Sequence, residues 1–251
     1  MAGPLTGRQA LVTGGSRGIG RAVAAALTAA GATVTVLGRD RSALEGVVAA
    51  GEAHGFATAD VSDRAALRAA VAGMERPVDL LVANAGGAVS KPFGRTEEQD
   101  FSAMLGVNLM GVVNAVQAVL PGMTERGFGR IVAVASTAGL KGYPYVTAYC
   151  AAKHAVLGLV RSLALELART GVTVNAVCPG FTDTDLVATS LDRIVEKTGR
   201  TRDEALAELT RSNPQGRLVR PAEVADAVTW LCGAGAGAVT GQAIAVAGGE
   251  V

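Results

Sequence analysis

The fold of this chain is decided by the stretch Gln9-Ala10-Leu11-Val12-Thr13-Gly14-Gly15-Ser16-Arg17-Gly18-Ile19-Gly20. A short apolar run ends there in a glycine-rich turn, and apolar residues then recur at helical spacing up to Ala30. A second apolar run at 32–37 completes a βαβ unit. Glycines at such a junction allow a sharp turn and let a diphosphate reach the amides at the helix N-terminus, where the helix dipole favours negative charge.

Apolar runs and helical patterns alternate along the rest of the chain. A length of 251 residues suits one α/β domain with a large core. We therefore predict one Rossmann-type doubly wound domain over residues 1–251, with a seven-stranded parallel sheet flanked by helices on both faces. Further strands are expected at 56–61, 78–83, 130–135, 172–177 and 243–246, and further helices at 63–74, 99–120, 147 to about 169, and 221–231.

Composition argues against two classes of partner. The net charge is +1 with acids and bases interspersed, which provides neither a basic face for nucleic acid nor a polybasic membrane anchor. Residues 1–8 lack an apolar signal segment, and no uninterrupted apolar run approaches the ~20 residues that a membrane span needs. We expect a cytoplasmic protein without nucleic-acid or membrane partners.

Potential metal ligands are sparse and scattered. Cys150, Cys178 and Cys232 match neither a metal-binding spacing nor a disulfide framework, so we interpret them as small buried hydrophobes. His54 and His154 have no second ligand-type residue at helical spacing. We expect no metal site.

The end of the second strand, Gly38-Arg39-Asp40-Arg41, distinguishes between dinucleotides. NAD sites usually place an acid there to hold the ribose 2′-hydroxyl. Here Gly38 offers no carboxylate, and Arg39 with Arg17 could clamp a 2′-phosphate by charge-assisted hydrogen bonds. Asp40 lies one residue beyond the usual acidic position and is interpreted as a cap for the helix beginning near Ser42. NADP(H) is favoured, and NAD(H) stays possible.

Polar residues follow several strands at the edge where ligands bind in open α/β sheets. Asn84, with Ala85 and Gly86, follows the fourth strand, and Ser136 follows the fifth. Tyr149 and Lys153 share a face of the helix that begins near Thr147. A cation beside a phenol favours the phenolate, so we expect Lys153 to lower the pKa of Tyr149 and make it a usable acid or base.

Two further features carry an interpretation. Asn108 interrupts the apolar helix expected at 99–120, and a buried amide needs hydrogen-bond partners. Residues 185–213 mix charges with spaced apolar residues and predict short amphipathic helices without a strand between them. An active-site lid is the natural interpretation, and a plain surface insertion is the alternative.

These motifs together resemble the short-chain dehydrogenase/reductase family over nearly the whole chain. Thr13 to Gly20 resembles its cofactor turn, so Gly14, Ser16, Arg17, Gly18, Ile19 and Gly20 are expected to contact the dinucleotide. Asn84-Ala85-Gly86 resembles its central-strand motif, and Ser136, Tyr149 and Lys153 its catalytic triad, with Asn108 at the fourth catalytic position. The resemblance implies that Asp60 and Val61 contact the adenine. It also implies that Thr184 helps to hold the nicotinamide carboxamide, beside Pro179, Gly180 and Thr182.

The chemistry suits these residue types. A ketone that accepts hydride develops an alkoxide, which Tyr149 can protonate while Ser136 hydrogen-bonds the carbonyl oxygen. Lys153 would also hold the nicotinamide ribose hydroxyls, and Asn108 would support a water that reprotonates Lys153. Two departures from the family pattern are visible, Ala83 before Asn84 and Ala247 in the C-terminal segment.

The segment 166–181 is similar to 3-oxoacyl thioester reductases, aromatic polyketide ketoreductases and 3-hydroxyacyl-CoA dehydrogenases. Two basic docking positions of carrier-protein reductases would fall at Gly127 and Thr170, whereas arginines stand one residue earlier, at Arg126 and Arg169. CoA, carrier-protein and free ketone substrates therefore stay open.

The leading hypothesis is an NADPH-dependent reductase of a 3-oxoacyl thioester or similar ketone. The alternatives are an NAD-dependent dehydrogenase that oxidises a secondary alcohol or 3-hydroxyacyl-CoA, and, more distantly, a non-catalytic dinucleotide sensor. The helix from Thr147 to Leu167 carries more apolar surface than one sheet contact uses. That surplus fits a subunit interface, and the resemblance implies a homotetramer.

Overall fold

Parallel strands form one sheet at the centre of the computed structural model, which describes residues 3–251 apart from the side chains of Leu186, Arg193, Ile194 and Lys197. Within this range there are seven strands: β1 (Gln9–Thr13), β2 (Thr33–Gly38), β3 (Gly55–Thr58), β4 (Leu80–Ala83), β5 (Gly129–Val134), β6 (Val172–Pro179) and β7 (Ala243–Val246). Their order is β3-β2-β1-β4-β5-β6-β7 and all neighbours pair in parallel. The predicted seven-stranded parallel sheet is confirmed. Residues 1–2 of the predicted domain, part of the N-terminal stretch, lie outside the described residues.

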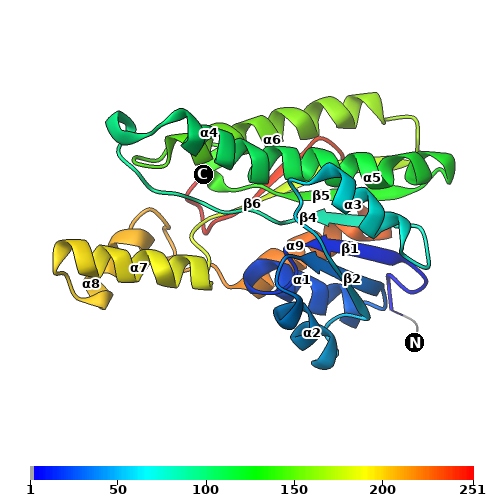
Figure 1. The fold of residues 1–251 in the computed structure, drawn as a ribbon, viewed down its shortest axis with the longest axis horizontal. Helices are drawn as coiled ribbons and strands as arrows, with labels where there is room; N and C mark the ends of the chain where they lie inside the picture. Colours follow the sequence, from blue (N-terminus) through cyan, green and yellow to red (C-terminus); the bar gives the residue numbers. More distant parts are fainter. Residues whose placement is uncertain (1–2) are drawn as a thin grey trace.

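Helices cover both faces of this sheet (Figure 1). One core cluster joins the sheet to α3, α5 and α6, and the other joins it to α1, α2 and α9. Each layer buries the apolar stripe of its helices against Val, Leu and Ile of the strands, as a doubly wound fold requires. The helices are α1 (Gly18–Ala29), α2 (Arg41–Ala49), α3 (Arg64–Ala72), α4 (Glu98–Leu105), α5 (Gly111–Glu125), α6 (Thr147–Glu166), α7 (Asp185–Thr198), α8 (Arg202–Thr210) and α9 (Pro221–Cys232).

The helix expected at 99–120 extends over Glu98–Glu125 as α4, one π-helical turn η2 (Gly106–Met110) and α5. By length and composition this 28-residue helix could cross a membrane, with a mean hydropathy of 1.7. This corrects the expectation that no segment approaches that length, because the expectation counted only uninterrupted apolar runs. In the structure the helix packs on β4, β5, α3 and α6. Core helices of soluble proteins pass the same test.

The predicted boundaries differ from the observed ones where side chains turn the chain. The third strand, expected to reach residue 61, ends at Thr58, because the Asp60 carboxylate accepts hydrogen bonds from the Ser62 amide and hydroxyl at 2.9 and 2.7 Å. The helix expected to reach about residue 169 ends at Glu166. By contrast β6 runs on to Pro179, so its carboxyl end reaches further than predicted.

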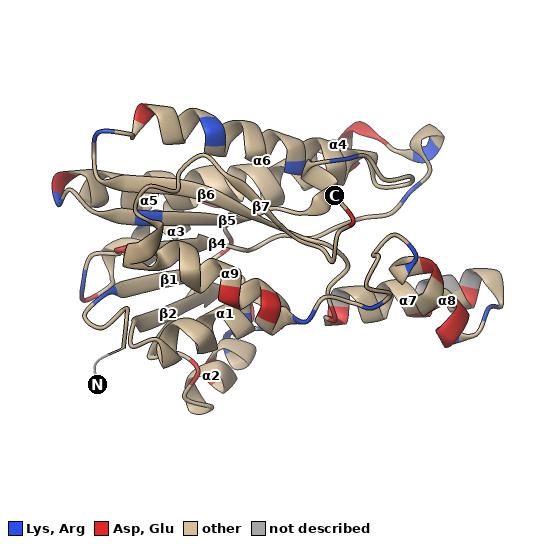
Figure 2. Cartoon of the chain, turned by 180° about the vertical axis from the view of Figure 1, so that it is seen from behind, with Lys and Arg blue, Asp and Glu red and all other residues tan. Residues whose placement is uncertain are grey.

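The segment 185–213 forms α7 and α8 with no strand between them, as the sequence predicts. The two helices project from the body of the molecule (Figure 1). They share a small core of Val187, Leu191 and Ala205, separate from the two main clusters. Charged residues of both signs are interspersed along the helices and loops, on this pair as on the main body (Figure 2).

Candidate active site

The glycine turn between β1 and α1 forms a cradle with no room for side chains. A Cβ at Gly20 would lie 2.2 Å from the Gly14 carbonyl oxygen, and one at Gly14 would lie 2.8 Å from the Ala85 Cα. Gly14 and Gly18 have φ of +66° and +52°, which favours glycine. The Arg17 side chain makes no capping hydrogen bond to α1, and the first turn of α1 contains no acid. The backbone amides of that turn are therefore available to a diphosphate, and the site fits a dinucleotide.

Asn84 braces this turn from the neighbouring strand. Its Nδ2 donates to the carbonyls of Thr13 and Gly14 at 3.0 and 3.1 Å. The amides of Asn84 and Ala85 both donate to the Thr13 hydroxyl at 3.1 Å. Thr13 belongs to the quoted motif, but this role of its hydroxyl was not predicted. The sequence signal for it is a hydroxyl residue at the last position of a buried strand.

The residues after β2 that are expected to determine the preference for NADP(H) or NAD(H) lie at the surface. Arg39 Nη1 is 3.7 Å from Asp60 Oδ2, and the Arg39 side chain is 79% exposed. Hydrogen bonds from Ser62 keep the pKa of Asp60 below its usual value. Asp40 caps α2 by accepting from the Ala43 amide at 3.1 Å, as expected. Val61 is buried, against Gly111 of α5.

Ser136 and Tyr149 meet at the carboxyl end of β5. Ser136 lies two residues after Val134, the last residue of this strand, and its Oγ accepts from the Ala138 amide at 3.1 Å. Tyr149 lies in the first turn of α6 and hydrogen-bonds Ser136. Burial raises the pKa of Tyr149, and the bond from Ser136 opposes that rise only in part. The phenol therefore keeps its proton at neutral pH.

Lys153 lies one turn further along α6 and is almost completely buried. Its Nζ donates to the Val134 carbonyl at 2.9 Å and lies 5.6 Å from the centroid of the Tyr149 ring. Burial lowers the pKa of Lys153 from 10.5 to about 8. The expectation that Lys153 lowers the pKa of Tyr149 is wrong for this structure, because both groups are desolvated and the ammonium is directed at a backbone carbonyl.

Asn108 reaches the same place from the π-helical turn. Its Nδ2 donates to the Gly87 carbonyl at 2.9 Å, and its Oδ1 accepts from the Gly87 amide at 3.3 Å. A Cβ at Gly86 would lie 2.6 Å from Asn108 Oδ1 and 3.7 Å from Lys153 Nζ. The structure thus brings the four predicted catalytic residues together. Asn108 was predicted as a site residue, but the π turn that carries it, a feature frequent at functional sites, was not predicted.

The segment after β6 closes the cradle from the other side. Pro179 ends β6, and the buried Thr182 donates to the Gly180 carbonyl at 3.0 Å. Thr184 precedes α7, and its Cγ2 lies 3.2 Å from where a Cβ of Gly18 would be. The segment expected to hold the nicotinamide end therefore touches the glycine turn.

Comparison with known proteins agrees with this geometry. The family model described as short chain dehydrogenase matches residues 8–195. The chain belongs to the short-chain dehydrogenase family. Members of this family are oxidoreductases, and the ketone-reducing and hydroxyl-oxidising relatives below place the chain among enzymes acting on CH–OH and ketone groups. The sensor hypothesis is thereby set aside.

Three relatives of this short-chain dehydrogenase cover nearly its full length. A crystal structure of a variant of actinorhodin polyketide ketoreductase with NADPH has a TM-score of 0.92 and 40% identity, covering 100% of this chain and 99% of that one. An acetoacetyl-CoA reductase of Rhizobium meliloti is 38% identical, over 97% of this chain and 98% of its own. A D-beta-hydroxybutyrate dehydrogenase of Cupriavidus necator is 35% identical, over 98% of this chain and 99% of its own.

Among the described residues, no group of three or more His, Cys, Asp or Glu could hold a metal ion.

The burial of Lys153 predicts a pH dependence of stability. Its folded pKa of about 8 lies below 10.5, so between these values the unfolded chain binds more protons here and the free energy of unfolding rises with pH. One pH unit contributes up to about 1.4 kcal/mol. We expect the free energy of unfolding of cofactor-free wild type, minus that of Lys153→Met, to grow by about 2 kcal/mol between pH 8 and 9.5.

Chemical denaturation at a series of pH values measures this difference, in which titrations common to both proteins cancel. Lys91→Met is the matched control, because Asp100 raises the pKa of Lys91 and moves its titration above this window. If the free energies of unfolding of wild type and Lys153→Met changed in parallel with pH, burial of the Lys153 ammonium would have no effect on stability, which would contradict the prediction.

Proposed function

We propose that this enzyme is an NADPH-dependent reductase that converts a ketone, a 3-oxoacyl thioester or a related carbonyl, into a secondary alcohol. The observation that carries the proposal is the hydrogen-bonded pair of Ser136 and Tyr149, with Lys153 behind it, beside an open glycine cradle. All of these groups lie at the carboxyl ends of parallel strands, where ligands of open α/β sheets bind.

The bound dinucleotide would supply a hydride to the carbonyl carbon. Tyr149 would protonate the oxygen, and its raised pKa keeps the proton on the phenol until an alkoxide develops. Ser136 would donate to the same oxygen and stabilise its charge. Lys153 donates one N–H to the Val134 carbonyl, which leaves two N–H donors for the ribose hydroxyls. Asn108 would hold a water that returns a proton to Lys153.

The choice of NADPH rests on charge beyond β2. Arg39 is exposed and paired only at 3.7 Å with Asp60, so its guanidinium can turn to a 2′-phosphate, together with Arg17. Asp40, the acid next to Arg39 in the sequence, accepts from the Ala43 amide as a helix cap, which leaves it less free to bind a ribose hydroxyl. A related ketoreductase binds NADPH. In this proposal Asp60 and Val61 contact the adenine.

Relatives support the substrate class, since one is an acetoacetyl-CoA reductase and another a polyketide ketoreductase. One of the two arginines near the docking positions, Arg126, is not free to bind a carrier protein. Arg126 is engaged with the Val78 carbonyl at 2.7 Å and with Asp79 at 3.4 Å. The relative that oxidises hydroxybutyrate supports the second candidate, an NAD-dependent dehydrogenase using the same site in reverse.

A homotetramer remains a prediction. Most apolar residues of α6 on which it was based pack inside the chain, including Val156, Val160 and Ala164. Leu165, 81% exposed, is the large apolar side chain that α6 leaves to a partner. Light scattering measures the oligomeric state, and a monomer contradicts the prediction. Cytoplasmic localisation also stays a prediction.

The first test removes the proposed proton donor. Tyr149→Phe should reduce turnover of a 3-oxoacyl thioester roughly a thousandfold or more, because the ring packs as before but the alkoxide finds no acid. NADPH should still bind, as measured by fluorescence titration. Tyr145→Phe is the matched control, since that ring is 61% exposed on the preceding loop. Full activity in Tyr149→Phe would contradict the assignment.

The second test addresses the dinucleotide. Arg39→Asp should lower the ratio of kcat/KM for NADPH over NADH about 10- to 100-fold, because a charge-assisted contact to the 2′-phosphate is replaced by repulsion. Arg41→Asp is the control, because Arg41 pairs with Glu45 at 2.8 Å on the helix surface. An unchanged ratio in Arg39→Asp would favour the NAD-dependent alternative.

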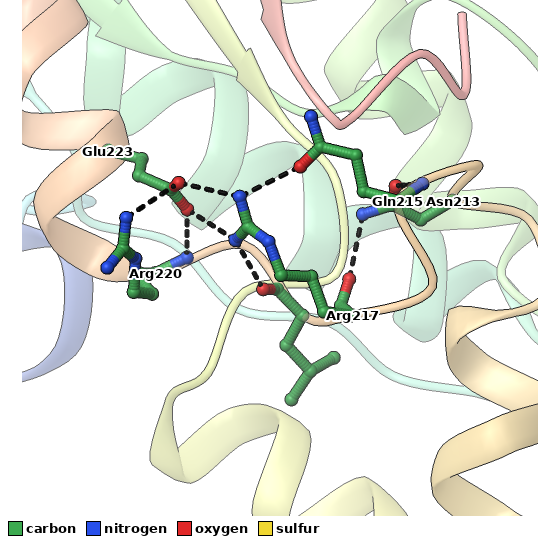
Figure 3. Close-up of polar contacts among 6 residues, drawn as sticks. Asn213, Gln215, Arg217, Arg220 and Glu223 are labelled. Atoms are coloured by element: carbon green, nitrogen blue, oxygen red, sulfur yellow. Dashed lines mark hydrogen bonds and ion pairs between the residues drawn. The ribbon is translucent and has the colours of Figure 1, made fainter.

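We further propose that 185–213 is a lid over the substrate. Its two arms meet in a bridge between Thr182 and Val219, and the returning arm is fixed by a bidentate ion pair of Arg217 with Glu223 at 2.7 and 2.8 Å (Figure 3). Asn213 holds the same arm by donating to the Arg217 carbonyl at 2.7 Å. Outside these anchors the helix pair has its own core, so it can close as a unit.

Limited trypsin digestion tests the lid. The exposed Arg200 and Arg202 lie at the junction of α7 and α8. Cleavage there should slow several-fold when NADPH and a 3-oxoacyl thioester are both bound, while cleavage after Arg126 at the opposite end of the sheet should not change. Equal cleavage with and without ligands would make the segment a surface insertion.

A further inference from the structure

A buried carboxylate lies at the centre of the loops around the candidate site. The Glu250 side chain is 1% exposed, although it follows the last strand, β7. Its Oε1 accepts from Tyr143 Oη at 2.6 Å and lies 3.1 Å from Lys141 Nζ. Ser212 hydrogen-bonds the same carboxylate. Its Oε2 lies 3.1 Å from where a Cβ of Gly180 would be, so a side chain there would displace it.

The donor and the acceptor of each hydrogen bond in this cluster can be assigned. The Tyr143 hydroxyl carries one proton and lies between Glu250 Oε1, at 2.6 Å, and Thr137 Oγ1, at 2.7 Å. Burial raises the pKa of Glu250, but hydrogen bonds from Tyr143, Ser212 and Lys141 have the larger combined effect and bring the pKa below its usual value. The carboxylate is therefore charged and only accepts hydrogen bonds. Thr137 must therefore donate to Tyr143, and Tyr143 to Glu250.

This relay ends beside Ser136. Thr137 is the next residue, and it opens the short 3₁₀ turn Thr137–Gly139 that the Ser136 hydroxyl caps. Thr137 is itself buried, 3% exposed. Once its hydroxyl is fixed by Tyr143, the backbone that directs Ser136 towards Tyr149 has little freedom to rotate.

The same carboxylate connects three loops from different parts of the chain. Tyr143 and Lys141 belong to the loop after β5, Gly180 to the loop after β6, and Ser212 to the returning arm of the lid. The Tyr143 ring meets the Phe181 ring edge to face, with centroids 6.2 Å apart and an interplanar angle of 84°. Asn213 and Pro214 of the arm pack on Gly248 and Gly249, next to Glu250.

We propose that Glu250 is a positioning residue of the reductase, which holds Ser136 against Tyr149 through Tyr143 and Thr137 and anchors the lid arm to the same point. The proposal rests on the proposed function, because it assigns the effect of Glu250 to the carbonyl-binding pair. Glu250 does not touch the reacting atoms. It acts through the loop that carries Ser136.

A purely structural role is the competing explanation, and the chain offers a matched control. Asp79, 9% exposed, lies at the opposite, amino end of the sheet. Its carboxylate accepts from the Gln9 amide at 3.1 Å and pairs with Arg126 at 3.4 Å. Asp79→Asn therefore perturbs a similarly buried acid and leaves the candidate site untouched.

The experiment compares Glu250→Ala, Glu250→Gln, Tyr143→Phe and Asp79→Asn with wild type in NADPH-dependent ketone reduction. We expect Glu250→Ala to lower kcat about tenfold or more, with the KM for NADPH changed less than twofold. Glu250→Gln should retain most of kcat, because its amide oxygen still accepts from Tyr143. Tyr143→Phe keeps its ring on Phe181 but breaks the relay, so it should match Glu250→Ala, and the double variant should be no slower than either.

A pH profile separates positioning from stability. The bond from Ser136 opposes the rise in the pKa of Tyr149. Loosening Ser136 should therefore shift the acidic limb of kcat for alcohol oxidation to higher pH in Glu250→Ala and Tyr143→Phe, but not in Asp79→Asn. Loss of kcat with no shift, a loss in Asp79→Asn as large as in Glu250→Ala, or wild-type kcat in Tyr143→Phe would overturn the proposal.

Amide hydrogen exchange makes the outcome independent of activity. Residues 137–143 and 212–214 should exchange at least tenfold faster in Glu250→Ala than in Asp79→Asn. If wild type reduces no ketone but this difference appears, the proposed function fails and the anchoring role of Glu250 stands. Equal exchange in the two variants would overturn the anchoring role, whatever the activity.

Discussion

One hydroxyl at the end of β1 accepts hydrogen bonds from two backbone amides that follow β4. The Thr13 Oγ1 accepts from Asn84 and Ala85, each at 3.1 Å, and the Asn84 amide closes the contact on the Thr13 and Gly14 carbonyls. These bonds fix the glycine turn where the order of the sheet reverses, between β1 and β4. This contact therefore holds the first turn of α1 at the edge of the sheet where ligands of open α/β folds bind. A looser junction would lose the cradle and the site beside it.

Desolvation dominates the electrostatics of the candidate site. It raises the pKa of Tyr149 above its usual value and lowers that of Lys153 from 10.5 to about 8, so burial favours the uncharged form of both groups. The phenol therefore keeps its proton over the pH range in which Lys153 loses its own. Burying Lys153 with one backbone acceptor, Val134, costs stability, which fits a group retained for chemistry.

Strand and helix order could be predicted from the sequence because apolar periodicity and glycine turns are local signals. The strands Gln9–Thr13 and Ala243–Val246 were predicted with their observed bounds. The third strand was predicted too long, since the apolar pattern runs on past the bonds of Asp60 to Ser62 that turn the chain. The effect of Lys153 on Tyr149 was predicted wrongly, because sequence spacing contains no information on burial.

The candidate residues were found from motifs, but their supports were not. Asn108 was identified as a polar interruption in an apolar helix, whereas its two bonds to Gly87 depend on a π turn that has no local sequence signature. Glu250 was not predicted as a site residue, because its partners Lys141, Tyr143 and Ser212 lie far away in the sequence. A carboxylate near the end of a chain has no pattern that predicts burial, and only the folded loops show it.

The site has one rigid side and one side that can move. The glycine turn, Asn84 and Lys153 are hydrogen-bonded to strands of the central sheet, so their positions are set by the stability of the whole domain. The α7–α8 pair has its own small core and meets the rest through the Thr182–Val219 bridge and the contacts around Glu250. Motion of this pair as the proposed lid would break these contacts and leave the sheet folded. Because Glu250 belongs to the same contacts, opening the lid would loosen the anchor of Ser136 but leave the glycine turn, Asn84 and Lys153 in place.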